Sequence, residues 1–260
     1  MNGQGALKGQ VWRMSLGQTP RLVEDMLADE RPWAIVLGGE EATRLMVSPG
    51  EDMAALAAGY GLTMGWLELE GPLPAVVVDA PGRRVLVAGP LLPRPEQGPR
   101  GAGGGPTGPA AAKPLADDLR LELATALGLI EAMARGQALF AQTGASHGAA
   151  IFDACGAPLA VAEDVGRHNA LDKAVGAAWL AGALGRARIA ALSGRVSLEM
   201  ALKAGRVGLQ MVVSVSAPTA AAVEAARAMG LTVIGFARGS RLNVYSHPQR
   251  LVVDGRPFHA

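Results

Sequence analysis

The sequence contains one cysteine, Cys155, among its 260 residues. A single cysteine excludes a disulfide bond within the chain, and a zinc site would need histidines and carboxylates beside at most one thiolate. No segment reaches the roughly 18 uncharged apolar residues that a membrane-spanning helix requires. The N-terminal residues also lack the continuous apolar core of a signal peptide. We therefore expect a soluble, cytoplasmic protein with no membrane partner.

The chain also lacks an excess of charge of either sign, because its 24 lysines and arginines nearly balance its 23 aspartates and glutamates. The net charge of +1 gives no general electrostatic reason to expect a nucleic acid or an anionic membrane as partner. Any anion must then be bound by a local group of residues. Apolar residues, by contrast, make up 50% of the chain, which is enough for a substantial core in one large domain or two modest ones.

The first part of the chain, residues 1–89, is predicted to form a small α+β domain. An acidic start and a glycine stop predict a helix at 51–60, and Gly38-Gly39 supplies the turn between two neighbouring strands. The predicted strands of this domain lie at 10–16, 32–38, 43–47, 63–69, 74–79 and 83–88.

A segment rich in glycine and proline follows at residues 90–114, PLLPRPEQGPRGAGGGPTGPAAAKP. It offers almost nothing to bury, which predicts a mobile segment. Long loops without secondary structure are usually linkers or functional lids. Both interpretations stay open for this segment.

The remainder, residues 115–260, is predicted to be a larger α/β domain. A long amphipathic helix is expected at 115–141, and the alternation of strands and helices after it indicates a layered sheet with parallel βαβ units. The expected strands lie at 148–153, 158–163, 187–192, 210–215, 231–236 and 242–246, and the expected helices at 167–181, 196–206 and 218–229.

The densest group of polar residues lies at 144–173, between and beside two of these strands. It holds His147, the only cysteine, and the run EDVGRHNALDK, which includes Arg167 and His168. A core or turn histidine would explain His147, and a capped helix with i,i+4 pairs would explain much of the run. Neither explains so many polar side chains at one strand–helix junction, and we therefore expect ligand contacts here.

Three further polar turns each follow a predicted strand of the larger domain. In parallel sheets the carboxyl ends of strands share one edge, where helix N-termini attract anions. Helix capping alone would explain Ser216, whereas a glycine beside an arginine suits close approach to phosphate. Together the turns indicate a ligand that carries phosphate, and their candidate residues are Ser193, Arg195, Ser216, Arg238 and Arg241.

Five segments, taken in order and spacing, closely resemble the FdhD family, the formate dehydrogenase accessory sulfurtransferases. They are TGASHGAAIFD, EDVGRHNALDK, LSGRVSLEMALKA, SVSAPTAAAVEAA and GFARGSRLNVYSHPQR. The resemblance covers roughly residues 140–250, and residues 20–90 fit the more variable N-terminal part of the family.

The resemblance implies a cytidine-deaminase-like layered α/β domain with a smaller N-terminal domain, usually in a homodimer. It also implies transfer of persulfide sulfur from a cysteine desulfurase to the molybdenum cofactor, a bis-molybdopterin guanine dinucleotide, before the cofactor enters formate dehydrogenase. The run that matches the family's cofactor-binding segment is Phe236, Ala237, Arg238, Gly239, Ser240 and Arg241.

Two departures from the family pattern affect the expected chemistry. The family carries its persulfide on a cysteine of a Cys-x-x-Cys motif in the loop that corresponds to 90–114, and no cysteine occurs there. Cys155 lies instead in a predicted hairpin turn, so either it has taken over or sulfur is not carried covalently. The family's Gly-Gly-Thr-His also reads Gly-Ala-Ser-His here, at residues 144–147.

Three functions remain to be compared. The first is a sulfurtransferase that uses Cys155 or an external thiol. The second is a non-catalytic chaperone for the molybdenum cofactor or a guanine nucleotide. The third, a deaminase-like hydrolase, is disfavoured because the His-x-Glu and Pro-Cys-x-x-Cys of zinc deaminases do not occur.

Overall fold

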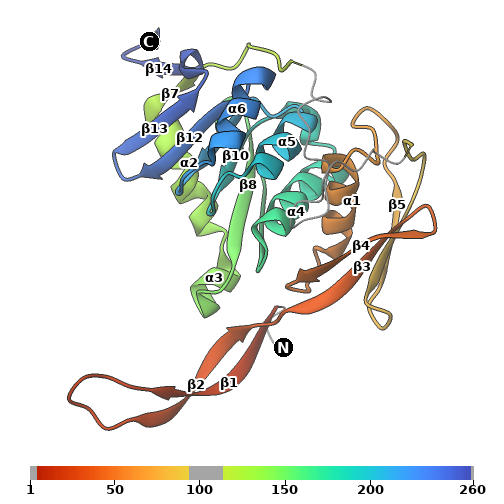
Figure 1. The fold of residues 1–260 in the computed structure, drawn as a ribbon, viewed down its shortest axis with the longest axis vertical. Coiled ribbons are helices and arrows are strands. Elements are labelled where there is room, and N and C mark those ends of the chain that lie inside the picture. The colour runs from red at the N-terminus through yellow and green to blue at the C-terminus, as the bar shows by residue number, and fades with distance from the viewer. Residues whose placement is uncertain (1–4, 94–113, 259–260) are drawn as a thin grey trace.

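The computed structural model describes residues 5–93 and 114–258. Within these ranges the chain forms a mixed α/β body from which a long two-stranded arm projects (Figure 1). The predicted α/β class is confirmed, and the structure has several sheets, whereas the likeness to cytidine deaminases stays a prediction. The predicted mobile segment at 90–114 lies almost entirely outside the described residues.

A six-stranded sheet lies at the centre of the body, with the strand order β13-β12-β11-β10-β8-β9. The three middle strands β10, β11 and β12 run parallel, and the outer pairings are antiparallel. Its strands are β8 (His147–Asp153), β9 (Pro158–Asp164), β10 (Ala187–Leu192), β11 (Met211–Ser214), β12 (Thr232–Arg238) and β13 (Arg241–Ser246).

Helices cover both faces of this sheet, because its strands are apolar on both sides. Ile151 and Ala190 belong to an apolar cluster with four helices on one face, whereas Phe152 and Ile189 pack toward α2 on the other. The first face is covered by α1 (Met53–Thr63), α4 (Arg167–Leu180), α5 (Leu198–Arg206) and α6 (Ala220–Met229), and the second by α2 (Leu123–Arg135). Short 3-10 helices lie at Leu184–Arg186 and Pro248–Arg250.

The N-terminal part contributes a four-stranded sheet and α1, which packs against α4. Gly59 and Gly176 lie at this contact, where an added Cβ on either would overlap the backbone of the facing helix. One continuous apolar cluster therefore contains residues of both parts of the chain. The strands are β3 (Arg31–Leu37), β4 (Glu40–Val47), β5 (Ala75–Asp79) and β6 (Arg84–Ala88), in the order β4-β3-β6-β5.

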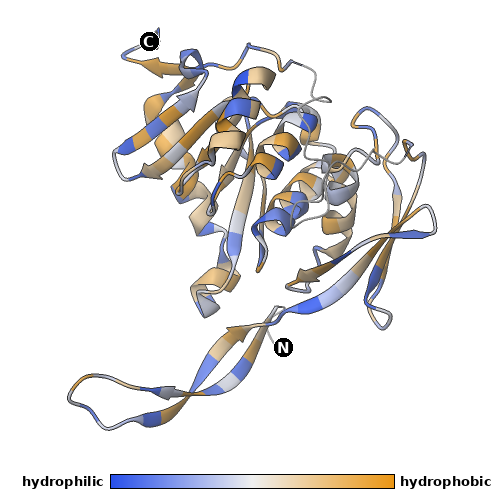
Figure 2. Ribbon diagram, in the orientation of Figure 1, coloured by the Kyte–Doolittle hydropathy of each residue, from blue (hydrophilic) through white to orange (hydrophobic). Residues whose placement is uncertain are grey.

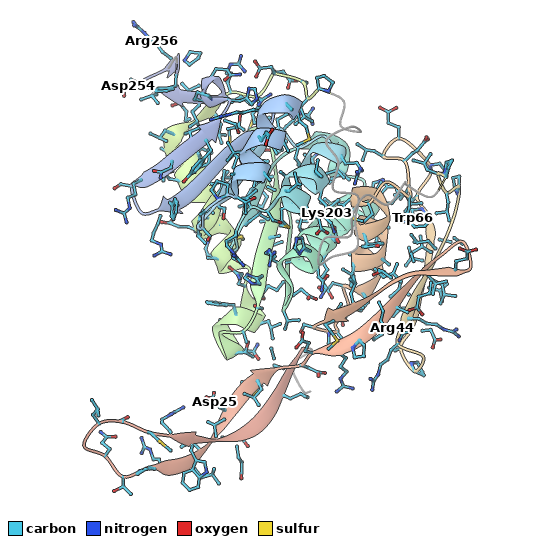
Figure 3. The ribbon with its side chains drawn as sticks, viewed as in Figure 1. Asp25, Arg44, Trp66, Lys203, Asp254 and Arg256 are labelled. Atoms are coloured by element: carbon cyan, nitrogen blue, oxygen red, sulfur yellow. The ribbon has the colours of Figure 1, made fainter. Side chains whose placement is uncertain are left out.

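The arm is an antiparallel hairpin of β1 (Ala6–Arg13) and β2 (Arg21–Ala28), and it carries Asp25 away from the body (Figure 3). Apolar and polar segments alternate along both of its strands (Figure 2). Trp12 and Leu22, a cross-strand pair, are exposed. A third small sheet is formed by β7 (Leu121–Glu122), β14 (Leu251–Val253) and β15 (Arg256–Pro257).

The predicted elements from residue 147 onward are confirmed within three residues at each end, and so are the predicted strands 32–38, 43–47, 74–79 and 83–88. Two predictions are wrong. The segment 63–69 is no strand, because it continues from the end of α1 into turns. The single helix predicted at 115–141 is replaced by β7, α2 and the short helix α3 (Ala138–Thr143). The helical conformation is interrupted at Gly136, between α2 and α3. The strand predicted at 10–16 overlaps β1, and β2 was missed.

Candidate functional site

Three polar turns meet at one edge of the six-stranded sheet. Since β10, β11 and β12 run parallel, their carboxyl ends lie at the same edge. The Ser214 hydroxyl donates a hydrogen bond to the carbonyl oxygen of Gly194 at 2.6 Å. The amide of Phe236 donates to the carbonyl oxygen of Ser216 at 3.2 Å. The prediction that the turns converge is confirmed for those after β10 and β11, whereas the contact with β12 is made by a strand residue before the turn at 239–240.

His147 and Ser193 form one corner of this edge. The Nδ1 atom of His147 lies 3.2 Å from the hydroxyl oxygen of Ser193, which also accepts a hydrogen bond from the Gly148 amide at 2.9 Å. Burial, and then the positive charge of Arg167, lowers the pKa of His147 below 6.5. The imidazole is therefore neutral near pH 7, so that one ring nitrogen can accept the Ser193 hydrogen while the other offers an N–H.

Arg167 lies beside this corner, in the first turn of α4. Its Nε atom is buried and has no hydrogen-bond partner among the described residues. The N-cap of α4 is Gly166, and within residues 5–93 and 114–258 no side chain caps the helix. A Cβ added at Gly194 would lie 3.2 Å from His147 Nδ1 and 3.5 Å from the Cβ of Arg167, so these groups share one corner. A guanidinium at an uncapped helix N-terminus favours an anion.

His168 points toward α5 rather than toward His147. Its Nε2 atom lies 3.4 Å from the Ser197 hydroxyl oxygen and 3.6 Å from a carboxylate oxygen of Glu199. Burial, and then the positive charge of Lys203, lowers the pKa of His168 to about 3. The ring is neutral at physiological pH, and it joins the start of α4 to the start of α5 as a hydrogen-bonding group.

A cavity of about 550 Å³ opens next to the corner of His147 and Ser193. Its walls combine apolar side chains with a few polar groups, which is the usual composition of a small-molecule site. The lining residues are Ile130, Met133, Ala134, Gln137, Phe140, Gly144, Ala145, Ser146, His147, Val165, Ser193 and Val215. Of the predicted site residues, the cavity wall contains His147 and Ser193.

The apolar wall of this cavity was missed by sequence reasoning. Ile130, Met133 and Phe140 all fall within the single amphipathic helix predicted at 115–141, which gave no reason to expect a cavity wall there. The break at Gly136 gives α3 its own direction, so that Phe140 reaches the cavity mouth and is exposed there. The glycine was the one local signal for the break.

The turn that follows β11 departs from the expected helix start. Thr219, not Ser216, is the N-cap of α6, and its side chain accepts a hydrogen bond from the Ala222 amide at 3.2 Å. Ser216 therefore does not cap the helix, which begins later than expected, at Ala220. Its carbonyl oxygen is bound to the Phe236 amide instead.

The predicted cofactor-binding run 236–241 lies at the end of β12 and in the turn to β13. Phe236 is half exposed and adopts a left-handed backbone with φ of 52°. Such a conformation is uncommon for a residue other than glycine and is found at ligand sites. Ala237 is buried, whereas Arg238, Gly239, Ser240 and Arg241 are exposed. Arg195, in the neighbouring turn, is exposed as well.

Most of the polar run at 163–173 lies inside the protein and not on the cavity wall, contrary to our interpretation. Asp164 is buried, accepts hydrogen bonds from Gly166 and Ser48 amides, and pairs with buried Lys173 at 2.9 Å. Asn169 donates to the Met46 carbonyl oxygen at 2.8 Å. These contacts attach the start of α4 to the end of β4, which explains the polar density without a ligand.

Cys155 is exposed in the turn between β8 and β9. Its amide donates a hydrogen bond to the Asp153 carboxylate at 2.9 Å. Since β8 runs from His147 to Asp153, at about 3.4 Å per residue this turn lies roughly 20 Å from the His147 corner. The structure therefore does not bring Cys155 together with the other predicted site residues.

Two further findings limit the chemistry. Among residues 5–93 and 114–258, no three or more His, Cys, Asp and Glu side chains are grouped so that they could hold a metal ion. No helix in the same ranges is long and apolar enough to cross a membrane.

Comparison with known proteins connects this chain to one family. The model of the FdhD/NarQ family matches residues 28–252. The sulfur carrier protein FdhD of Anaeromyxobacter dehalogenans (strain 2CP-C) is 37% identical over 262 residues, which cover 90% of this chain and 91% of that protein. The protein of the same name from Thermoplasma acidophilum is 47% identical over 135 residues, so that 52% of this chain matches 48% of that relative.

A solved structure supports the same relationship. The crystal structure of a protein from Desulfotalea psychrophila, assigned as a formate dehydrogenase accessory protein, has a TM-score of 0.80 at 26% identity. The match covers 95% of this chain and 99% of that one. The resemblance seen in the sequence is confirmed, and the chain belongs to the FdhD/NarQ family.

Proposed function

We propose that this protein is an accessory protein of formate dehydrogenase. It binds the molybdenum cofactor, bis-molybdopterin guanine dinucleotide, as a client at the sheet edge described above, and it supports sulfuration of the cofactor and its delivery to the enzyme. Membership of the FdhD/NarQ family and relatives named sulfur carrier protein FdhD support this function.

The observation that carries the proposal is the buried Nε of Arg167 without a hydrogen-bond partner among the described residues. An unpaired buried donor on a charged group is unfavourable, and a ligand oxygen would remove that cost. The cofactor's guanine dinucleotide ends carry diphosphates, which suit a guanidinium at the uncapped start of α4. Arg167 would hold a phosphate, with the remaining N–H of His147, whose ring is oriented by Ser193, offering a hydrogen bond beside it.

The outer turns supply further groups for a ligand of this size. Arg195 follows β10, and Arg238 and Arg241 pair across the turn between β12 and β13. All three are exposed, so their guanidinium groups can turn toward an anion at the sheet edge. Phe236, with its left-handed backbone, presents an aromatic ring at the same edge. Stacking on this ring would orient a guanine base.

The test is thermal denaturation of the full chain with guanosine diphosphate as probe. Binding to the folded state raises the midpoint, by an amount that corresponds to about 2.7 kcal/mol when the probe is at a hundred times its Kd. Arg167→Ala and Arg195→Ala should lose this rise. Arg256→Ala, which changes an arginine remote from the site (Figure 3), should keep it. A wild-type midpoint that does not respond to the probe contradicts the proposal.

The sulfur step remains a separate question, because the loop Cys-x-x-Cys of the family does not occur in this chain. In the sulfurtransferase version, the Cys155 thiolate attacks the outer sulfur of a persulfide on a cysteine desulfurase. A new S–S bond forms on Cys155, and the cysteine of the desulfurase leaves as a thiolate. Incubation with a desulfurase and cysteine should add one sulfur atom to Cys155, as seen by mass spectrometry.

One observation favours the second candidate, a non-catalytic chaperone for the cofactor or a guanine nucleotide. Cys155 lies at the far end of β8 from the His147 corner, roughly 20 Å away by strand length. In this version the probe binds, Cys155→Ala keeps full accessory activity, and no persulfide forms. A persulfide on Cys155 combined with loss of activity in Cys155→Ala would instead establish the sulfurtransferase.

The remaining parts of the proposal concern the assembly and fold. We propose a cytoplasmic homodimer with a cytidine-deaminase-like larger domain, as the family resemblance implies. Sedimentation of the purified chain tests the dimer, and a single species with the mass of one chain contradicts it.

A further inference from the structure

The short helix α3 lies at the cavity and packs against the strands β1 and β2 of the arm. It runs from Ala138 to Thr143, and none of its residues is buried. Glycines flank it, with Gly136 at the break after α2 and Gly144 in a left-handed conformation at its C-cap. Most helical stability in proteins comes from packing of an apolar face, so α3, whose residues are not buried, needs a further source.

That source is the carboxylate of Glu163, at the end of β9. One oxygen accepts a hydrogen bond from the Leu139 amide at 2.7 Å. The other accepts from the Phe140 amide at 2.8 Å and from the Ser146 hydroxyl at 2.7 Å. A negative charge at a helix start also interacts favourably with the helix dipole. A single side chain thus attaches both the beginning of α3 and the turn that follows it.

The attached segment separates two cavities. Phe140, Ser146 and His147 face the cavity of about 550 Å³ described above. Leu139 and Glu163 line a second cavity of about 340 Å³ on the other side. A displacement of α3 would therefore change the shape of the first cavity at the residues that meet a ligand.

We infer that Glu163 is a positioning residue of the ligand cavity. Its carboxylate fixes α3 and the turn at 144–147, and it thereby places Phe140, Ser146 and His147 against the ligand. This inference rests on the proposed function, since it assigns a role within the proposed binding site. Glu163 contacts the cavity wall and not the ligand, so its effect on binding acts through α3.

The first measurement is hydrogen exchange of the unliganded full chain. Glu163→Gln keeps the size of the side chain but removes one acceptor and the charge, and exchange at the Leu139 and Phe140 amides should accelerate roughly tenfold. The amides of β10 should keep their wild-type rates. Glu224→Gln, an exposed carboxylate on α6, is the matched control and should leave α3 unchanged.

The second measurement is the dissociation rate of guanosine diphosphate. Glu163→Gln should release the probe roughly tenfold faster, and Ser146→Ala, which removes one of the three hydrogen bonds, less so. Ser146→Thr restores the hydroxyl and should restore slow release, which a loss of stability alone would not do. Should a Glu163 variant fail to fold, the Ser146 pair is measured by hydrogen exchange of the unliganded chain, where faster exchange at Leu139 and Phe140 in Ser146→Ala cannot come from a lost ligand contact.

The outcomes separate this inference from the proposed function. Wild-type binding with unchanged release from Glu163→Gln overturns the positioning role and leaves the proposed function standing, even where α3 exchanges faster. Unchanged exchange at Leu139 and Phe140 overturns the anchoring of α3. A wild-type chain that does not bind the probe overturns the proposed function, and the ligand part of the inference is rejected with it.

Discussion

Replacing Lys203 tests whether the buried charges at the centre of the molecule determine its stability. Lys203 lies in the interior, between α5 and the neighbouring helices (Figure 3). Its Nζ atom is 2.5 Å from one carboxylate oxygen of Asp172, and the Thr63 hydroxyl donates a hydrogen bond to the other oxygen at 2.6 Å. Both charged side chains are nearly inaccessible, with 3% and 1% exposed. The three side chains join α5, α4 and α1.

Lys203→Met keeps most of the side-chain volume and leaves the Asp172 carboxylate buried without its cation. Removing one partner of a buried ion pair costs about 3–5 kcal/mol. A whole domain is commonly stable by about 5–15 kcal/mol, so this loss should be plain in urea unfolding. The double variant Lys203→Met with Asp172→Asn removes both charges while an amide oxygen still accepts from Thr63. It should be more stable than Lys203→Met alone.

The loss in Lys203→Met should depend on pH. Burial already raises the pKa of Asp172 above 3.8, and Lys203 is the main influence that lowers it. Without Lys203 the folded-state pKa rises further, while the unfolded-state value stays near 3.8. A raised folded-state pKa means stability that is present at low pH and lost as pH rises through that value. The variant should therefore lose more stability near pH 8 than near pH 5.

Two results would refute this reasoning. One is a loss below about 1 kcal/mol, which is the size expected for a solvent-exposed pair. The other is a double variant that is no more stable than Lys203→Met, which would mean that the uncompensated carboxylate is not the cause.

Two remaining predictions concern packing and acid stability. Gly176→Ala should destabilise by about 3 kcal/mol or more, because the added Cβ overlaps the Ala55 carbonyl on α1. Gly128 lies in the middle of α2, where an added Cβ meets no described atom within 4 Å, so Gly128→Ala should raise the free energy of unfolding by up to about 1 kcal/mol. Equal changes in the free energy of unfolding for the two glycine variants would contradict the packing argument. The lowered pKa of His168 should make the free energy of unfolding decline by about 1.4 kcal/mol per pH unit on acidification, between the unfolded pKa of 6.5 and the folded pKa of about 3. His168→Gln should remove this decline, as measured by urea unfolding across that pH range. A variant whose free energy of unfolding still declines as in the wild type would contradict the prediction.

The alternating half of the fold could be predicted from sequence because its signals are local. Strand β10 was placed at its observed bounds, since a short apolar run between polar turns leaves little choice. The segment before this alternating half, which forms α2 and α3, carries no such clear signal. The residues of α2 and α3 form one apolar periodicity with Gly136 as its one local interruption, and tertiary contacts such as that of Glu163 with Phe140 hold α3 as a separate helix. The arm was half missed, because β2 is exposed and its alternation is weak.

The location of the site could be predicted from the sequence, but the contacts of its side chains could not. Parallel strands bring Ser193 and Ser216 to one edge, and this follows from topology alone. Whether a polar side chain reaches the cavity depends on which groups it hydrogen-bonds in the folded protein. Asn169, for example, binds the carbonyl oxygen of Met46, 123 residues away, and such a partner cannot be found from local sequence. Burial therefore divides the polar run into groups that its composition did not distinguish.

This division affects how mutations in the run should be interpreted. Asp164 and Lys173 tie the start of α4 to the end of β4, and Arg167 takes its position from that tie. A change at Lys173 would move the Arg167 guanidinium without removing any group that touches a ligand. Loss of probe binding in such a variant is thus no evidence of contact. A variant that loses binding and keeps its unfolding midpoint excludes a loss of stability as the cause. Arg167, half buried and with no hydrogen-bond partner for its Nε among the described residues, is expected to behave in that way.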